Sequence, residues 1–273
     1  DLLKEFANLN DEDITLLNKE GGLSLDSANR MIENVIGTIP IPLGVALNFK
    51  INDRDYIIPM AIEEPSVVAA ASNAAKVARI KGGFSTSSTD PVMIGQIQVL
   101  DVENPEYKRV ELLEKKEELI KLANAQDPVL VKFGGGARYL TVTIRDSICG
   151  KMMVIHLLVD TRDAMGANAV NTMCESLKVK IEEITDGRVG LKIISNLAIY
   201  RLCRARAVFD KHELGGEEVV DRIIEAYAFA DADIFRCSTH NKGIMNGITA
   251  LMLATGNDTR AIEAGAHTYA SFQ

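Results

Sequence analysis

Two adjacent carboxylates, Glu63 and Glu64, stand directly before Pro65 and Ser66, where the spacing of apolar residues predicts the start of a helix over 67–80. Neighbouring carboxylates disfavour each other's ionised form, and burial disfavours it further, so that one of the two would donate a proton near neutral pH. Acids at this position also complement the helix dipole. The motif therefore indicates either a proton donor or an ordinary helix start.

A lysine with a small neighbour is the second candidate: Lys242 lies between Asn241 and Gly243, where it opens a helix predicted over 243–253. Glycine lets the backbone approach a ligand closely, and an ammonium ion there would stabilise an oxyanion. A surface lysine in a loop is the alternative. Asp258, at the start of the next predicted helix, is either a carboxylate of the same site or a helix N-terminal acid.

Asp163 and the small residues after it, in the sequence DAMGANAVN, open a helix predicted over 164–185. Small residues leave the first backbone N–H groups of a helix open to a pyrophosphate, so this is a candidate dinucleotide site. The G-x-G-x-x-G fingerprint of a Rossmann fold does not follow the first predicted strand. Three glycines at 134–136 form either a phosphate loop or a flexible connection.

The elements that must position these groups follow one regular order between 92 and 195. Strands are predicted over 92–100, 139–145, 152–159 and 189–195, and helices over 110–125 and 164–185. This β-α-β-β-α-β order is typical of a ferredoxin-like unit with helices on one face of an antiparallel sheet. We therefore predict an α+β protein in which a small domain over 91–196 is inserted into a helix-rich large domain formed by 1–90 and 197–273.

The large domain is predicted to be mostly helical. Its helices are expected over 11–18, 24–36, 67–80, 216–230, 243–253 and 258–270, and its two short strands over 56–60 and 205–209.

Composition limits the class of protein. The 273 residues are 47% hydrophobic and carry a formal net charge of −8, with basic residues dispersed among acids, which argues against a nucleic-acid binder. No apolar run reaches the roughly 18–20 residues that a membrane span needs, and no basic and apolar leader is visible. Four cysteines without a C-x-x-C pair predict reduced thiols, a cytoplasmic protein and no metal site.

These motifs together resemble those of class II, bacterial-type 3-hydroxy-3-methylglutaryl-CoA (HMG-CoA) reductases over nearly the whole chain. The resemblance rests on residues 33–37 (ENVIG), 63–66 (EEPS), 163–171, 239–247 and 254–258, which follow the family's order and spacing. Several long motifs in one order are far more specific than any one of them. The resemblance implies an NAD(H)-dependent, four-electron interconversion of HMG-CoA and mevalonate plus CoA in isoprenoid metabolism.

The resemblance also implies a role for individual residues. The family's catalytic and substrate-binding positions match Glu64, Lys242, Asp258, Asn246, Ser66 and Arg236. By that match Glu64 supplies a proton to the carbonyl oxygen, Lys242 stabilises the oxyanion, and Asp258 tunes the network that Asn246 joins. Ser66 and Arg236 match positions that hold the hydroxymethylglutaryl group, and a guanidinium suits its terminal carboxylate.

The family's cofactor-binding positions match Asp163, Met165, Gly166, Asn168 and Asp127. Asp127 matches an acid that contacts the adenosine ribose. A carboxylate there accepts hydrogen bonds from a free 2′-hydroxyl and would repel a 2′-phosphate, so that NADH is expected to be preferred over NADPH. A solvated acid at a helix end is the alternative. The resemblance further implies a homodimer or larger homo-oligomer, with a site between two subunits and 33–37 at their interface.

Family members continue beyond the segment matched by 257–270 into a mobile flap, whose histidine protonates the departing CoA thiolate. We therefore expect the chain as given to lack that flap, and we assign its role to none of His156, His212, His240 and His267. A non-catalytic module that binds CoA or a dinucleotide is the alternative function. An unrelated NAD-dependent dehydrogenase is disfavoured by the missing Rossmann fingerprint.

Overall fold

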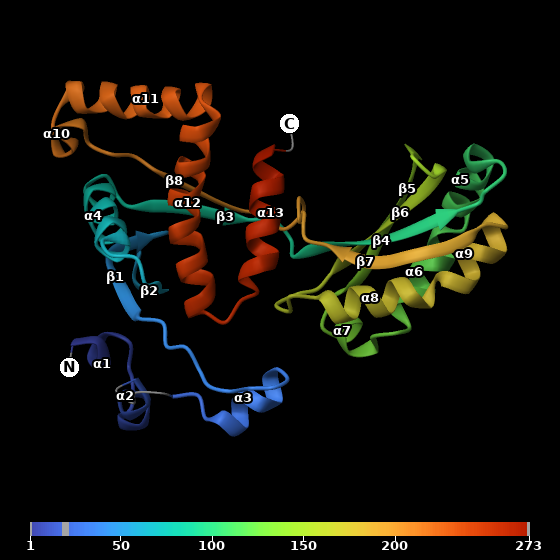
Figure 1. The fold of residues 1–273 in the computed structure, drawn as a ribbon, viewed down its shortest axis with the longest axis horizontal. Helices are drawn as coiled ribbons and strands as arrows, with labels where there is room; N and C mark the ends of the chain where they lie inside the picture. Colours follow the sequence, from blue (N-terminus) through green and yellow to red (C-terminus); the bar gives the residue numbers. More distant parts are fainter. Residues whose placement is uncertain (1, 18–21, 272–273) are drawn as a thin grey trace.

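The computed structural model describes residues 2–17 and 22–271, and it contains two sheets of four strands each. One sheet lies in the segment 92–195, called here the inserted unit, and the other lies in the rest of the chain, called the main body. Figure 1 shows the two sheets side by side along the longest axis of the molecule, with the C-terminal helices of the main body between them.

The inserted unit holds a sheet with the strand order β5-β6-β4-β7, in which every neighbouring pair is antiparallel. Its strands are β4 (Val92–Leu100), β5 (Gly136–Ser147), β6 (Gly150–Asp160) and β7 (Arg188–Ser195). The first and third strands in chain order lie in the centre, which is the arrangement of a split β-α-β motif. The ferredoxin-like prediction is therefore confirmed, and with it the α+β fold class.

Helices of the inserted unit pack on its sheet (Figure 1). They are α5 (Pro105–Glu114), α6 (Lys116–Asn124), α7 (Pro128–Lys132), α8 (Ala167–Ser176) and α9 (Lys178–Thr185). The core between helices and sheet is closed to solvent, since Ile97, Leu119, Ile155 and Met173 are each 0% exposed. Burying one such side chain contributes about 1.5–3 kcal/mol, so this core is the main source of stability in the unit.

One close approach fixes α8 on the sheet. A Cβ atom at Gly95 of β4 would lie 2.4 Å from Sγ of Cys174 and 2.8 Å from Cγ1 of Val170, both on α8. Only glycine therefore fits at this point of the strand. Burial raises the pKa of the Cys174 thiol to about 12, so this cysteine packs as a core residue and is not a nucleophile.

The main body is built on the second sheet, with the strand order β2-β1-β3-β8. Its elements are β1 (Leu43–Ile51), β2 (Arg54–Ala61), β3 (Phe84–Ser88), β8 (Cys203–Ala207), α1 (Leu2–Phe6), α2 (Asp11–Leu17), α3 (Leu25–Met31), α4 (Val67–Ile80), α10 (Lys211–Leu214), α11 (Glu217–Ala232), α12 (Ile234–Ala254) and α13 (Thr259–Ser271). Helices α4 and α12 pack on the sheet around a small core of Ala46, Met60 and Ala250. None of the helices in the described ranges is both long and apolar enough to cross a membrane.

Two neighbouring chain segments connect the main body to the inserted unit. β3 pairs with β8 along its whole length in an antiparallel ladder, so the chain leaves the main body and returns to it at one place. Thr89 closes this crossing, because its Oγ1 atom donates to the Tyr200 carbonyl at 2.7 Å and accepts from the Leu202 N–H at 2.8 Å. The crossing is thus fixed by hydrogen bonds on both strands of the connection.

The prediction of a mostly helical large domain missed half of its sheet, since neither β1 nor β3 was predicted. β1 is hard to recognise because Asn48, with φ +69°, lies at a bulge that breaks the alternation of inward and outward side chains. β3 consists largely of serine and threonine and has no buried residue, so it lacks the apolar alternation of a strand and is held by its pairing with β8.

Some helix boundaries also differ from the prediction. The helices predicted over 110–125 and 164–185 are each divided in two, with Lys115 and Leu177 at the breaks. Neither break contains glycine or proline, so the sequence carries no signal for it. The helix predicted over 24–36 ends at Met31. Asn18, the last residue of the helix predicted over 11–18, lies outside the described residues.

Replacing Gly95 with alanine should lower the free energy of unfolding by about 1–3 kcal/mol, because the added methyl group would overlap α8. Denaturant titration followed by circular dichroism measures the change. The matched control is Gly22→Ala, where a Cβ atom would meet nothing within 4 Å. An equal loss in both variants would contradict the packing argument.

Candidate active site

Lys242 lies in the middle of α12, so the prediction that it opens a helix was wrong. The helix already begins at Ile234, where the Asp233 side chain caps it by accepting the Arg236 N–H at 2.7 Å. The polar sequence before Lys242 is kept helical by this cap and by the buried residues Met245 and Ala250 further along α12. Lys242 therefore projects from a rigid helix and not from a loop.

The carboxylate of Glu64 contacts the ammonium group of Lys242, so the structure brings together two of the predicted catalytic residues. Asn246 lies one helical turn after Lys242 and donates from Nδ2 to Oε2 of Glu64 at 3.3 Å. With its amide turned over, Asn246 instead accepts from Nζ of Lys242 at 3.2 Å. In both orientations the three residues form one polar cluster, because residues four apart share a helix face.

This cluster is open to solvent. The side chain of Lys242 is 57% exposed and that of Glu64 is 41% exposed. An exposed ion pair contributes little to stability. A convergent ammonium, carboxyl and amide group can bind a carbonyl oxygen and exchange a proton with it. The arrangement is therefore better suited to a polar substrate than to stabilising the fold.

An unusual turn positions Glu64 at the entry to α4. Ser66, the N-cap residue of α4, has φ +72° in the left-handed region, and its side chain makes no capping hydrogen bond. This conformation is strained for a residue other than glycine, and such strain clusters at functional sites. The Ser66 hydroxyl is thus exposed next to the turn that carries Glu64.

Two further predicted residues stand apart from the cluster. Arg236 is half-buried in the first turn of α12, and its guanidinium makes no ion pair within the described residues. Asp258 is exposed just before α13, where its Oδ1 atom accepts the Ala261 N–H at 3.0 Å. In the described part of the chain its carboxylate makes no polar contact with Glu64 or Lys242.

Asp258 instead lines a hollow of about 490 Å³ between α13 and the inserted unit, called here the interbody hollow. Tyr269 lines it from α13, and Asp163, Met165 and Arg201 line it near the inserted unit. The hollow therefore places one predicted catalytic residue opposite two predicted cofactor-binding residues.

A second hollow, of about 510 Å³, lies on the inserted unit and is called here the α8 hollow. One wall is formed by Gln126 and Asp127, and the other by residues 164–169 and Thr172. It brings together Asp127, Met165, Gly166 and Asn168, four of the residues predicted to bind the cofactor. The first N–H groups of α8 belong to this wall, and such groups favour a phosphate.

Asp127 and Gly166 shape the two walls of the α8 hollow. The Oδ1 atom of Asp127 accepts the Leu130 N–H at 2.8 Å and caps α7, so its other carboxylate oxygen takes no part in the cap. Gly166 has φ +98°, and a Cβ atom there would lie 2.4 Å from Cγ2 of Thr161. Glycine is therefore required at Gly166 for both conformation and space.

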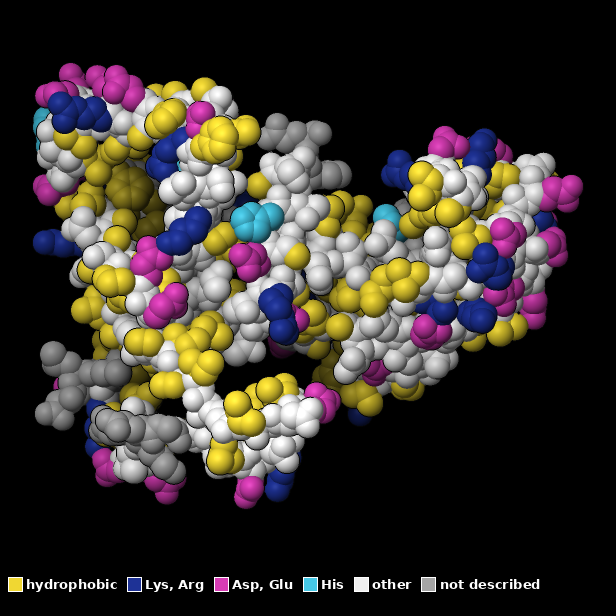
Figure 2. Space-filling view, viewed as in Figure 1, with side chains coloured by type: hydrophobic (Ala, Val, Ile, Leu, Met, Phe, Trp, Pro, Cys, Tyr) yellow, Lys and Arg dark blue, Asp and Glu magenta, His cyan; other side chains and the backbone are white. Residues whose placement is uncertain are grey.

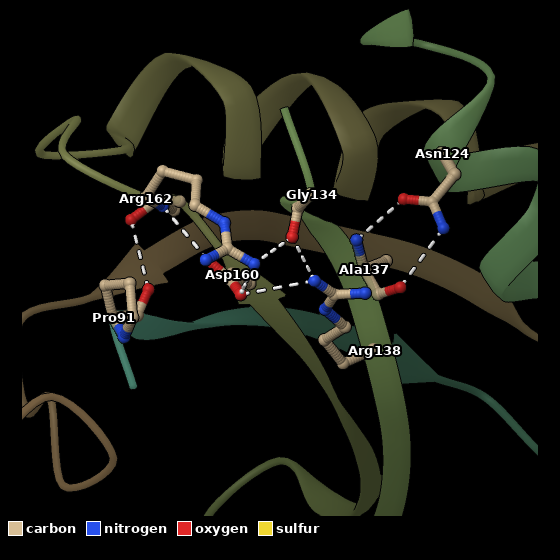
Figure 3. A network of polar contacts seen from close by, with 8 residues as sticks. Pro91, Asn124, Gly134, Ala137, Arg138, Asp160 and Arg162 are labelled. Atoms are coloured by element: carbon tan, nitrogen blue, oxygen red, sulfur yellow. Dashed lines mark hydrogen bonds and ion pairs between the residues drawn. The ribbon is translucent and has the colours of Figure 1, made fainter. Parts of the chain in front are cut away.

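A charged cluster at the end of β6, just before the turn that leads into α8, was not predicted from the sequence (Figure 3). Asp160, at the end of β6, is 5% exposed and forms ion pairs with Arg162 at 2.9 Å and with Arg138 at 3.3 Å. Both guanidinium groups also donate to the Gly134 carbonyl. The sequence does carry one signal for this cluster, which is an acid as the last residue of an apolar strand. A buried acid is almost always paired, so such a residue indicates a charged partner nearby.

Comparisons with known proteins agree on one family. The family model described as hydroxymethylglutaryl-coenzyme A reductase matches residues 1–273. The chain is 62% identical over 267 residues to the 3-hydroxy-3-methylglutaryl-coenzyme A reductase of Archaeoglobus fulgidus, covering 98% of this chain and 61% of that protein. It is 35% identical over 279 residues to a probable 3-hydroxy-3-methylglutaryl-coenzyme A reductase of Borreliella burgdorferi, again covering 98% and 61%.

Solved structures give the same result. The 3-hydroxy-3-methylglutaryl-coenzyme A reductase of Streptococcus pneumoniae superposes with a TM-score of 0.95 at 43% identity, covering 99% of this chain and 74% of that one. The class II enzyme of the same organism, bound to NADPH in open conformations, has a TM-score of 0.95 at 42% identity. The chain spans about 61% of the length of the two curated relatives.

Replacing Gly166 with alanine should loosen the first turn of α8, because the new methyl group would displace Thr161. We expect amide hydrogen exchange at 170–172, the first hydrogen-bonded amides of α8, to accelerate by about tenfold or more, the equivalent of about 1.4 kcal/mol, while exchange in β4 stays unchanged. Gly247→Ala on α12, where a Cβ atom meets nothing within 4 Å, is the control. Unchanged exchange at 170–172 would show that the turn tolerates a side chain.

Proposed function

The chain belongs to the hydroxymethylglutaryl-coenzyme A reductase family, in its class II branch, and we propose on this basis that the protein interconverts HMG-CoA and mevalonate plus CoA in mevalonate metabolism. The observation that carries the proposal is the contact of Glu64 with Lys242 and Asn246. These groups suit the reduction of a thioester carbonyl, since that reaction develops negative charge on an oxygen and then requires a proton there.

In this proposal each residue of the cluster has one task. Lys242 stabilises the developing oxyanion, Glu64 delivers a proton to the same oxygen, and Asn246 holds the two side chains in place. The exposed hydroxyl of Ser66 and the guanidinium of Arg236 bind the hydroxymethylglutaryl group, because a guanidinium pairs well with a carboxylate. Asp258, in the interbody hollow, tunes the cluster once substrate is bound.

The proposed cofactor is a nicotinamide dinucleotide, which supplies the hydride when bound. The α8 hollow fits it, because Gly166 keeps the first turn of α8 free of side-chain bulk and the N–H groups there favour a pyrophosphate. Met165, Asn168 and Asp163 would contact it from the same turn. We propose that Asp127 binds the ribose and favours NADH over NADPH.

We further propose a homodimer or larger homo-oligomer in which the site is completed by a second copy of the chain. Support comes from the α8 hollow, whose lining includes none of Glu64, Lys242 and Asn246. Apolar side chains are also exposed on and after α3, where Met31 is 70% and Ile36 101% exposed. Figure 2 shows apolar side chains gathered over this segment. Large exposed apolar patches are typical of subunit interfaces.

A cytoplasmic location belongs to the same proposal. It is supported by the cysteines Cys149, Cys174, Cys203 and Cys237, which are all free thiols in the described structure. Free thiols are usual where the redox environment is reducing.

Replacing Lys242 with alanine should lower the rate of NADH oxidation with HMG-CoA by at least about 10²-fold, because one oxyanion donor is lost. The rate is measured on the full-length protein by absorbance at the nicotinamide band. Lys76→Ala, an exposed lysine on α4, is the matched control and should keep full activity.

Two outcomes of this assay would overturn the proposal. Equal rates in the Lys242 variant and the wild type would remove Lys242 from the chemistry. Binding of NADH without turnover in the wild-type full-length protein would favour a non-catalytic binding module.

Replacing Asp127 with asparagine should lower the ratio of kcat/KM for NADH to that for NADPH by about tenfold or more, because a charge-assisted hydrogen bond to the ribose is lost and the repulsion of a 2′-phosphate ends. Asparagine caps a helix as well as aspartate does, so α7 is preserved. The control is Asp101→Asn, whose carboxylate pairs with Arg188 at 3.0 Å elsewhere in the inserted unit. An unchanged ratio would assign the choice of cofactor to other residues.

A further inference from the structure

We propose that Asp160 is a positioning residue for the dinucleotide, because it holds both walls of the α8 hollow through Arg138 and Arg162. The inference rests on the proposed dinucleotide site. Asp160 is not among the residues that line the α8 hollow. Any effect it has on a ligand there is therefore transmitted by its neighbours.

The Asp160 carboxylate is satisfied from three directions. Its Oδ2 atom lies 2.9 Å from Nη2 of Arg162 and 3.3 Å from Nη2 of Arg138, and its Oδ1 atom accepts the backbone N–H of Arg162 at 3.1 Å. A buried carboxylate is tolerated only with such partners. Without its charge, two guanidinium groups would face each other with nothing to neutralise them.

The first wall depends on the network through Gly134. Its carbonyl accepts hydrogen bonds from both guanidinium groups, as Figure 3 shows. Gly134 lies two residues after the end of α7, the short helix capped by Asp127, and its N–H donates to the Val131 carbonyl of that helix at 3.0 Å. Asn124 fixes the start of β5, just after this loop, by bonding to both backbone groups of Ala137, at 2.7 and 3.1 Å. Fixing Gly134 therefore fixes the end of α7 and the wall that carries Asp127.

The second wall depends on the network through Arg162. This residue has φ +53°, which is uncommon for a residue other than glycine, and it directly precedes the turn 163–166 that leads into α8. A strained conformation persists only when surrounding contacts hold it. Asp160 supplies two of those contacts, one to the backbone and one to the guanidinium. The turn that carries Met165 and Gly166 is thus held against the wall that carries Asp127.

The test is fluorescence titration of the full-length protein with NADH, beside calorimetric titration with HMG-CoA. In Asp160→Asn the dissociation constant for NADH should rise by at least about tenfold, because charge-assisted contacts that hold both walls are lost. The dissociation constant for HMG-CoA should change by less than about twofold, as expected for a distant site. If Asp160 had a purely structural role, its replacement would weaken the binding of both ligands or of neither.

The matched control is Asp186→Asn. Asp186 pairs with Lys108 at 2.8 Å in the same unit, at the end of α9 remote from the first turn of α8 (Figure 1). Asparagine tolerates its left-handed conformation. This variant should bind NADH as the wild type does. If Asp160→Asn does not fold, Arg162→Gln and Arg138→Gln replace it, because both side chains are about half exposed. Each of these variants should show the same rise in the dissociation constant for NADH.

A double-variant cycle identifies the route of the effect. If Asp160 acts through Arg162, the variant with Asp160→Asn and Arg162→Gln together should bind NADH no more weakly than the weaker single variant. The inference is overturned if the two single losses of NADH affinity multiply in full in the double variant. It is also overturned if folded Asp160→Asn binds NADH with unchanged affinity. A wild-type protein that binds neither NADH nor NADPH would overturn the proposed function itself.

Discussion

The pairing of β3 with β8 is the interaction on which the rest of the structure depends. These strands flank the inserted unit in the sequence, and their ladder returns the chain to the main body after the excursion through 92–195. Because β8 is fixed beside β3, the helices that follow it are delivered onto the same sheet, where α12 packs against β2 and α4. Glu64 and Lys242, separated by 178 positions, can then meet.

The contact between Glu64 and Lys242 is a poor candidate for a purely structural interaction. Both side chains are near half exposure or above it, and exposed pairs contribute about 0–1 kcal/mol to stability. The fold is instead stabilised by apolar burial, most of it in the inserted unit, where the large fully buried side chains are found. The ion pair is therefore a consequence of how the sheet and α12 are placed, and its open side leaves room for a substrate.

The sequence was informative where one physical pattern dominated. Alternating strands and amphipathic helices predicted the inserted unit, and the motifs around Glu64, Lys242 and Gly166 contain several of the residues that line the two hollows or form the cluster. It was uninformative for β3, whose mostly exposed polar residues form a strand by pairing with β8, and for the breaks at Lys115 and Leu177. The Asp160 cluster was missed because its members come from two segments, 134–138 and 160–162, that are far apart in the sequence, so no local spacing could reveal it.

The turn after Asp160 connects the two hollows physically. Met165 lines both the α8 hollow and the interbody hollow, and Asp163 lines the second of them beside Asp258. Arg201, on the segment that returns to the main body, donates to the Ala164 carbonyl at 2.8 Å and to Oγ1 of Thr161 at 3.2 Å. The same turn is thus held by Arg162 from one side and by Arg201 from the other. Because Met165 lines both hollows, a displacement of this turn would alter both linings together, whereas Ser66 and Arg236, the residues proposed to bind the hydroxymethylglutaryl group, line neither.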